Sequence, residues 1–292
     1  MTTEPLAVLL IVLRVAGYAG FVLWAGPLIF WTLVWPTGRQ HRRLLRLSGV
    51  GALLLILTSI AEPAIRLTAT SQPLDEVAPP LAGAAMLLRL AILVGSLFYL
   101  VDLVAGAVVG GRRAVALAAI VVVAATVAVQ PMASGQPGPL LAALGTIGQL
   151  LATAAWLGGL VALATVVRPH AETRESGEAD GLVTRFSPVA TRGLVLLVLA
   201  SGLIVLAGAG GPFAPAEQRE VSMLLRFALL AALFVVAWYA HRATARLAFR
   251  RLFSPLGATG SARDRTLTLV VGTELAIAFG ALAVAVLVVL VS

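Results

Sequence analysis

The feature that most limits the possible folds of this chain is a succession of long, continuous apolar runs separated by short polar segments. A helix that crosses the hydrocarbon core of a bilayer needs about 20 mostly apolar residues. Of the 292 residues, 60% are hydrophobic and 12% are charged, whereas a soluble domain carries about 25% charged residues. Strands of a membrane barrel would alternate apolar and polar residues, which these runs do not. The sequence therefore predicts an all-α, polytopic transmembrane helix bundle.

We predict about eight spanning helices, which together leave room only for short loops. They cover residues 5–35, 45–68, 81–109, 114–131, 139–167, 188–209, 221–241 and 266–291. Ser187 followed by Pro188 has the pattern of an N-cap and a first helical proline, so we expect the sixth helix to begin there. Pro27 lies inside the first span and is expected to kink it. The chain divides into an N-terminal four-helix half, 1–138, and a C-terminal four-helix half, 139–292.

The arginines predict the orientation of the bundle. All 21 basic residues are Arg and the formal charge is +8. Most of them lie between spans, so membrane topology explains the charge and no nucleic-acid partner is expected. The segments after the first, third, fifth and seventh spans hold fifteen arginines, and the opposite segments hold Arg219 alone. Because cytoplasmic loops carry the basic excess, both termini should face away from the cytoplasm.

Ionisable residues inside a membrane span are costly, so they normally face the interior of a bundle. The predicted spans contain several, and the candidates for a buried polar site are Arg14, Glu62, Arg66, Arg89, Arg226 and Glu274. Counting about 1.5 Å per residue places them in the outer half of the membrane, except Glu274, which falls near the midplane. Two interpretations are open: ion pairs that lock helices together, or the lining of a transport path or polar-ligand site.

Methionine gives a second candidate site. Besides Met1 there are three methionines, Met86, Met132 and Met223, and all project to the outer ends of their spans. Thioethers are soft ligands that select Cu(I), although methionine also fills gaps in apolar cores. The chain has no Cys, and its three histidines lie in or beside the cytoplasmic segments. If copper binds at the outer surface, these thioethers are the expected ligands.

Four motifs follow one another in the C-terminal half: Gln149-Leu-Leu-Ala-Thr-Ala-Ala-Trp156-Leu-Gly158-Gly159, Phe186-Ser187-Pro-Val-Ala190, Met223-Leu-Leu-Arg226 and Val-Val-Gly-Thr-Glu274. In order and spacing they resemble the copper resistance protein D (CopD) family over about residues 139–292. The N-terminal half resembles it only through Arg14, Gly26, Phe30 and Arg89. The resemblance implies an eight-helix protein of the plasma (inner) membrane, associated with copper uptake or homeostasis. It implies copper as the bound ion and an extracellular or periplasmic copper carrier as a partner.

The chain departs from the family at its histidines. The family has one His seven residues before the signature Trp and a second near the outer end of the preceding helix. Gln149 stands at the first position and Met132 lies near the second. Either thioethers replace the histidines, or this chain has lost copper handling. The run Trp156-Leu-Gly158-Gly159 also permits an interpretation as packing, because small residues beside a Trp admit another helix.

These patterns favour a membrane permease for copper or a copper-linked species. The alternative is a non-transporting scaffold or assembly factor that has lost the family's copper ligands. An enzyme is not expected, because the sequence offers no nucleophile–base pair or metal triad. The chain also has no Lys and no phosphate-binding loop motif, so we do not expect it to drive transport with ATP by itself. The oligomeric state is left open.

The predicted topology can be tested by cysteine labelling, because the chain has no Cys of its own. Gln136→Cys should react with a membrane-impermeant maleimide added to intact cells, and Gly177→Cys should react only after the membrane is opened. Labelling of Gly177→Cys from outside would overturn the orientation.

Overall fold

The structure, a computed structural model, describes residues 3–35, 42–70, 80–104, 112–133, 139–172 and 176–209. The α-helices in these ranges are α1 (Thr3–Leu33), α2 (Arg42–Thr70), α4 (Pro80–Val104), α5 (Arg112–Ala133), α6 (Pro139–Thr153), α7 (Gly159–Glu172) and α8 (Ser176–Ala209). A π-helical turn, η1 (Ala154–Gly158), joins α6 to α7. Every regular element of the described residues is helical, which confirms the all-α prediction for them. The spans predicted at 221–241 and 266–291 lie outside these residues.

Five helical segments are long and apolar enough to cross a membrane: Val8–Leu33, Arg42–Thr68, Pro80–Leu100, Leu140–Val166 and Thr184–Ile204. Arg113–Val129 is a shorter apolar helix. These six correspond to the first six predicted spans. Many of their large apolar side chains are exposed, such as Phe98 at 70% and Leu87 at 65%. Such surfaces suit contact with lipid chains, so the chain has the helices of a multi-pass membrane protein.

Helix α1 lies at the centre of the described bundle. Its side chains Phe21, Trp24 and Phe30 have no exposed surface. One side of α1 contributes Trp24 and Phe21 to a core shared with α2, α4, α5 and α6. The other side contributes Phe30 to a core shared with η1, α7 and α8. Both hydrophobic clusters of the bundle therefore depend on this one helix.

Glycines set how closely α1 approaches its neighbours. A Cβ atom added to Gly158 of η1 would lie 2.6 Å from the Cα atom of Gly26 in α1. On the α2 side, a Cβ atom added to Gly51 would overlap the backbone of Leu23 and Trp24. Backbones can approach this closely only where the residue that faces the neighbouring backbone has no side chain. Two glycine contacts on different sides thus hold α1 between α2 and η1.

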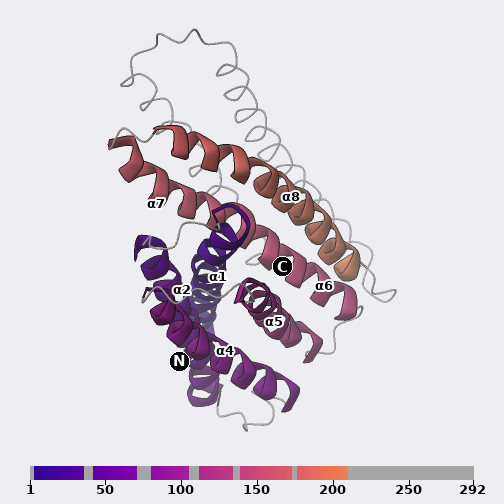
Figure 1. The fold of residues 1–292 in the computed structure, drawn as a ribbon. Helices are drawn as coiled ribbons and strands as arrows, with labels where there is room; N and C mark the ends of the chain where they lie inside the picture. The colour runs from indigo at the N-terminus through magenta and orange to yellow at the C-terminus, as the bar shows by residue number, and fades with distance from the viewer. Residues whose placement is uncertain are drawn as a thin grey trace.

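The segment from Pro139 to Glu172 forms one continuous rod with α8 running back beside it (Figure 1). The sequence predicts a single span here, and η1 interrupts it without ending it. A π turn holds one more residue than an α turn, so it shifts the faces that follow it. Gly158 therefore contacts α1, while Gly159 lies against the ring of Phe186 in α8.

The expected start of the sixth helix at Ser187 and Pro188 is wrong. Helix α8 begins at Ser176, and Pro188 lies inside it. The first turns are held by tertiary packing, since Leu182 and Phe186 are 3% and 4% exposed within the core. The carbonyl of Ser187 accepts a hydrogen bond from the Thr191 hydroxyl at 3.0 Å. Burial of this face outweighs the local capping pattern, which is a weaker signal.

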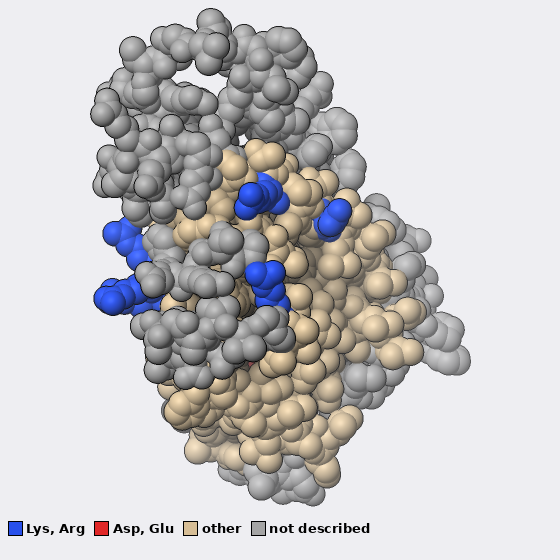
Figure 2. Space-filling view, in the orientation of Figure 1, with Lys and Arg blue, Asp and Glu red and all other residues tan. Residues whose placement is uncertain are grey.

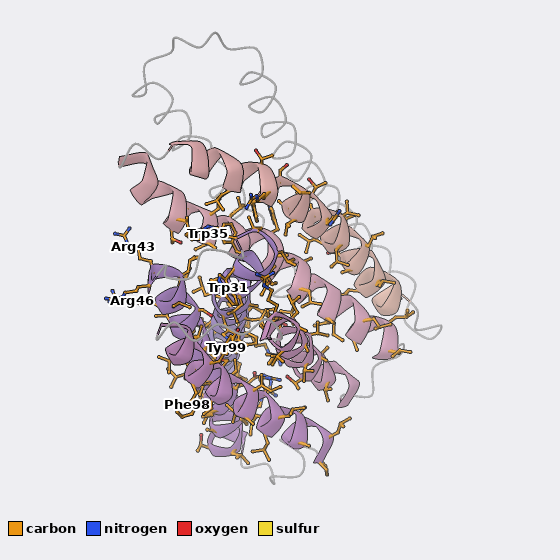
Figure 3. The ribbon with its side chains drawn as sticks, viewed as in Figure 1. Trp31, Trp35, Arg43, Arg46, Phe98 and Tyr99 are labelled. Carbon is orange, nitrogen blue, oxygen red and sulfur yellow. The ribbon has the colours of Figure 1, made fainter. Side chains whose placement is uncertain are left out.

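Basic side chains on the visible face lie in one part of the described surface. Figure 2 shows the blue side chains in the upper part of the tan surface and none in its lower part. Arg43 and Arg46 project outward from the first turns of α2, and Trp31 and Trp35 lie near the same end (Figure 3). Arginine beside tryptophan is typical of the interface between a bilayer and water.

The glycine contact between α1 and η1 generates a stability prediction. Gly158→Ala should lower the unfolding temperature of the purified protein in detergent, because its Cβ atom would overlap backbone atoms of α1, which cannot move to another rotamer as a side chain can. We expect the free energy of unfolding to fall by about 1–3 kcal/mol, the usual cost of overpacking. Gly95→Ala in α4 is the matched control, since nothing lies within 4 Å of its Cβ position. An equal effect of both substitutions would contradict this account.

Candidate functional site

The buried guanidinium of Arg89 is the centre of the polar site. Arg89 projects from α4 and is only 7% exposed. Its Nε donates to the Thr126 hydroxyl at 3.2 Å, and its Nη2 donates to the Thr126 carbonyl at 2.8 Å. Its Nη1 donates to the Ser59 hydroxyl at 3.3 Å. Arg89 thus connects α4 to α5 and α2 through neutral oxygens.

A hydrogen bond within α5 fixes the orientation of the Thr126 hydroxyl that accepts from Arg89. Its hydroxyl donates to the carbonyl of Val123, one turn earlier in α5, at 2.7 Å. The oxygen therefore presents a lone pair to Arg89, and the carbonyl of the same residue takes the neighbouring N–H. One edge of the guanidinium is occupied by a single residue, which fixes the orientation of its plane.

An ion-pair group lies beside this site. Glu62 of α2 accepts from Arg14 Nε of α1 at 3.3 Å and from Arg66 Nη2 of α2 at 3.1 Å. Both bonds end on the same oxygen, Oε1. The Glu62 side chain is 14% exposed, whereas Arg14 is 47% exposed. The group therefore connects α1 to α2 at the edge of the bundle, with the carboxylate inside and one arginine reaching outward.

Tyr18 of α1 relates the two groups to each other, because it interacts electrostatically with Arg14, Glu62 and Arg89. Glu62 also interacts electrostatically with Arg89, beyond the 4 Å limit of an ion pair. The structure thus brings together four of the predicted charged residues, Arg14, Glu62, Arg66 and Arg89. Arg226 and Glu274 lie outside the described residues.

The residues of the family signature form a second, apolar cluster. Trp156 and Phe186 are buried at 5% and 4% exposed surface. The rings of Phe30 and Phe186 lie 6.0 Å apart between centroids. Gly158 meets Gly26, and Gly159 meets Phe186. Residues of the two predicted halves therefore meet here, and every one of these contacts is a packing contact.

Two further signature positions have simpler surroundings. Gln149 is half-buried in α6, and its carbonyl accepts from the Thr153 hydroxyl at 2.7 Å. Ser187 is half-buried in α8. Neither side chain has a hydrogen bond recorded among the described residues, so the structure assigns them no partner.

The predicted thioether site is placed only in part. Met86 is half-buried in α4, three residues before Arg89 and so on the same face of the helix. Met132 belongs to α5, but its side chain is outside what the structure describes, as is all of Met223. Among the described residues, His, Asp and Glu form no group of three that could hold a metal. Copper ligation by these methionines stays a prediction.

Sequence reasoning singled out the charged residues and missed the neutral ones that hold them. Ser59 and Thr126 supply all three acceptors of Arg89, yet each is a single hydroxyl residue in an apolar run. A signal was present, because a buried Arg needs acceptors and few polar residues share its predicted depth. No sequence pattern of this kind predicted the π turn at Ala154–Gly158.

Comparison with protein-family models, with curated proteins and with solved structures finds no match to this chain.

The Glu62 ion pairs generate a prediction about stability. Glu62→Gln should lower the free energy of unfolding by about 1 kcal/mol or less per ion pair, because Arg14 and Arg66 are partly exposed. The unfolding temperature should fall modestly as a result. A double-mutant cycle with Arg14→Gln measures the pair directly. Additive effects of the two substitutions would show that the contact does not stabilise the bundle.

Proposed function

We propose that this chain is a multi-pass permease of the plasma membrane, of the CopD type, that moves copper or a copper-linked species. The observation that carries the proposal is the meeting of residues chosen only by their resemblance to one family. Gly26 and Phe30 come from the loosely similar N-terminal half, and they contact Gly158 and Phe186 of the signature region. Residues that carry the resemblance in the two halves of the chain thus lie together in the bundle.

The polar site supports a transport role. Ionisable side chains buried among apolar helices are costly and usually mark a path or binding site. Arg89 lies nine residues from the start of α4, or about 14 Å along the helix axis. With both termini outside the cytoplasm, as the arginine distribution favours, this depth is in the outer half of the membrane. A species entering from outside would meet Glu62 and Arg89 first.

The second candidate is a non-transporting scaffold or assembly factor. Two observations favour it. The signature residues are closely packed, with Gly158 against Gly26, which suits a structural contact as well as a moving one. The guanidinium of Arg89 is also buried with no carboxylate of the described residues within 4 Å, and such a positive charge repels a bare metal cation.

Copper content separates the two candidates. Cells that produce the protein should accumulate or exclude copper differently from cells without it, measured by elemental analysis over a range of external copper. Equal copper content in both would leave the scaffold as the better account.

The thioether prediction gives a sharper test of copper handling. The triple variant Met86→Leu, Met132→Leu and Met223→Leu should lose Cu(I) binding, because thioethers are the soft donors expected at the outer surface. Leu keeps the apolar volume, so the fold should survive, with the unfolding temperature as the check. Unchanged Cu(I) binding in a folded triple variant would remove these methionines as ligands.

A further inference from the structure

We propose that Arg89 anchors an oxyanion site between α2, α4 and α5, and that the ligand is a phosphate-type group. The group can come from the headgroup of an anionic phospholipid or from a free oxyanion. This inference does not rest on copper transport, because it follows from the surroundings of Arg89 alone.

The first observation is that Arg89 is charged, buried and bonded to neutral atoms only. A guanidinium has five N–H donors, and three of them donate to Thr126 and Ser59. No carboxylate of the described residues lies within 4 Å of it. Burying an ionised group without a counter-charge costs several kcal/mol, so such groups normally have an anionic partner.

The second observation is which donors of the guanidinium remain. Thr126 occupies the edge formed by Nε and Nη2 with its hydroxyl and carbonyl. The two remaining N–H groups belong to Nη1 and Nη2. A guanidinium held in one plane with donors on both terminal nitrogens suits the paired oxygens of a phosphate or carboxylate.

The third observation is the charge of the neighbourhood. Glu62 is the carboxylate near Arg89 in the described residues, and its Oε1 already accepts from Arg14 and Arg66. Glu62 is thus already engaged, and among the described residues no carboxylate is left to pair directly with Arg89. An anion bound at Arg89 would compensate its buried positive charge, whereas a bare cation would be repelled by it.

The geometry also favours a small group over a large one. Ser59 and Arg89 are buried at 8% and 7% exposed surface, so a compact anionic group would require less rearrangement of the helices than a bulky one. Arg14 reaches from the interior toward the outer side of the bundle, which gives an anion a basic approach. A phosphate of a lipid or a free oxyanion meets both conditions.

The test uses the full-length protein purified in detergent, with two probes. In the first arm, the protein is placed in nanodiscs of phosphatidylglycerol or of phosphatidylcholine and is then delipidated. Native mass spectrometry counts the lipid molecules that remain bound from each kind of nanodisc. In the second arm, inorganic phosphate is titrated and the unfolding temperature is followed. Retention of phosphatidylglycerol identifies a lipid source, and a shift with inorganic phosphate alone identifies a free oxyanion.

Arg89→Gln should weaken whichever interaction is found by about tenfold or more, since it removes a charge-assisted bond. Arg46→Gln is the matched control, because it removes an exposed arginine at the opposite end of the bundle and should leave this binding unchanged. If Arg89→Gln does not fold, Arg89→Lys keeps the charge but loses the paired donors, and it should also bind more weakly. Binding equal to wild type in a folded Arg89 variant, or no binding in either arm, would overturn the proposal.

A carboxylate within the chain is the competing partner, and Glu274 is the acid predicted deep in the membrane. Glu274→Gln combined with Arg89→Gln in a double-mutant cycle of stability tests this pair. Strong coupling between the two residues, with no anion bound, would overturn the oxyanion site. Independent effects with anion binding retained in Glu274→Gln support it.

Discussion

The described bundle depends on how closely the backbone of α1 approaches its neighbours. In lipid, apolar side chains gain little by leaving one apolar surrounding for another, so helices associate through close packing and hydrogen bonds. Gly51 lets α2 reach the backbone of α1 at Trp24, and Gly158 lets η1 reach it at Gly26. The Ser48 hydroxyl donates to the Trp24 carbonyl at 2.9 Å on the same side. Pro27 has no N–H to donate to the carbonyl of Leu23, four residues before it. The bond from Ser48 to Trp24 therefore supports α1 where its own hydrogen bonding is weakest.

The polar site follows from this arrangement. With α1 held against α2, Arg14 reaches Glu62 across the helix contact. A second hydrogen bond, from Trp24 Nε1 to the Ser96 hydroxyl at 3.1 Å, connects α1 to α4. Helix α4 in turn presents Arg89 to α5 and α2. The cluster is therefore built from four helices, and the placing of Arg89 beside Glu62 and Arg14 is a property of their assembly that no single helix contains.

The signature region has a structural role whatever its function. At the π turn, Gly158 lies against α1 and Gly159 lies against α8, so two adjacent glycines receive two different helices. Trp156 fills the core between them at 5% exposed surface. π turns recur at functional sites, where the shifted helical face presents a residue that a regular helix could not. Here the residues at the π turn serve packing, and the charged cluster around Arg89 is the part with chemistry available.

The sequence by itself determined the helical class and the approximate positions of the first six spans, through the length of its apolar runs. It also identified the charged residues that interrupt those runs. Each of these follows from local composition, because a membrane span needs a continuous apolar run and a buried charge is visible as an exception to it. Local pattern failed at Ser187 and Pro188, where burial of Leu182 and Phe186 extends α8 past a capping signal. Only the tertiary structure decided that Ser59 and Thr126 hold Arg89, that Gly26 meets Gly158, and that one span contains a π turn. These features depend on which helix faces lie together, and that is fixed by the packing of residues far apart in the chain.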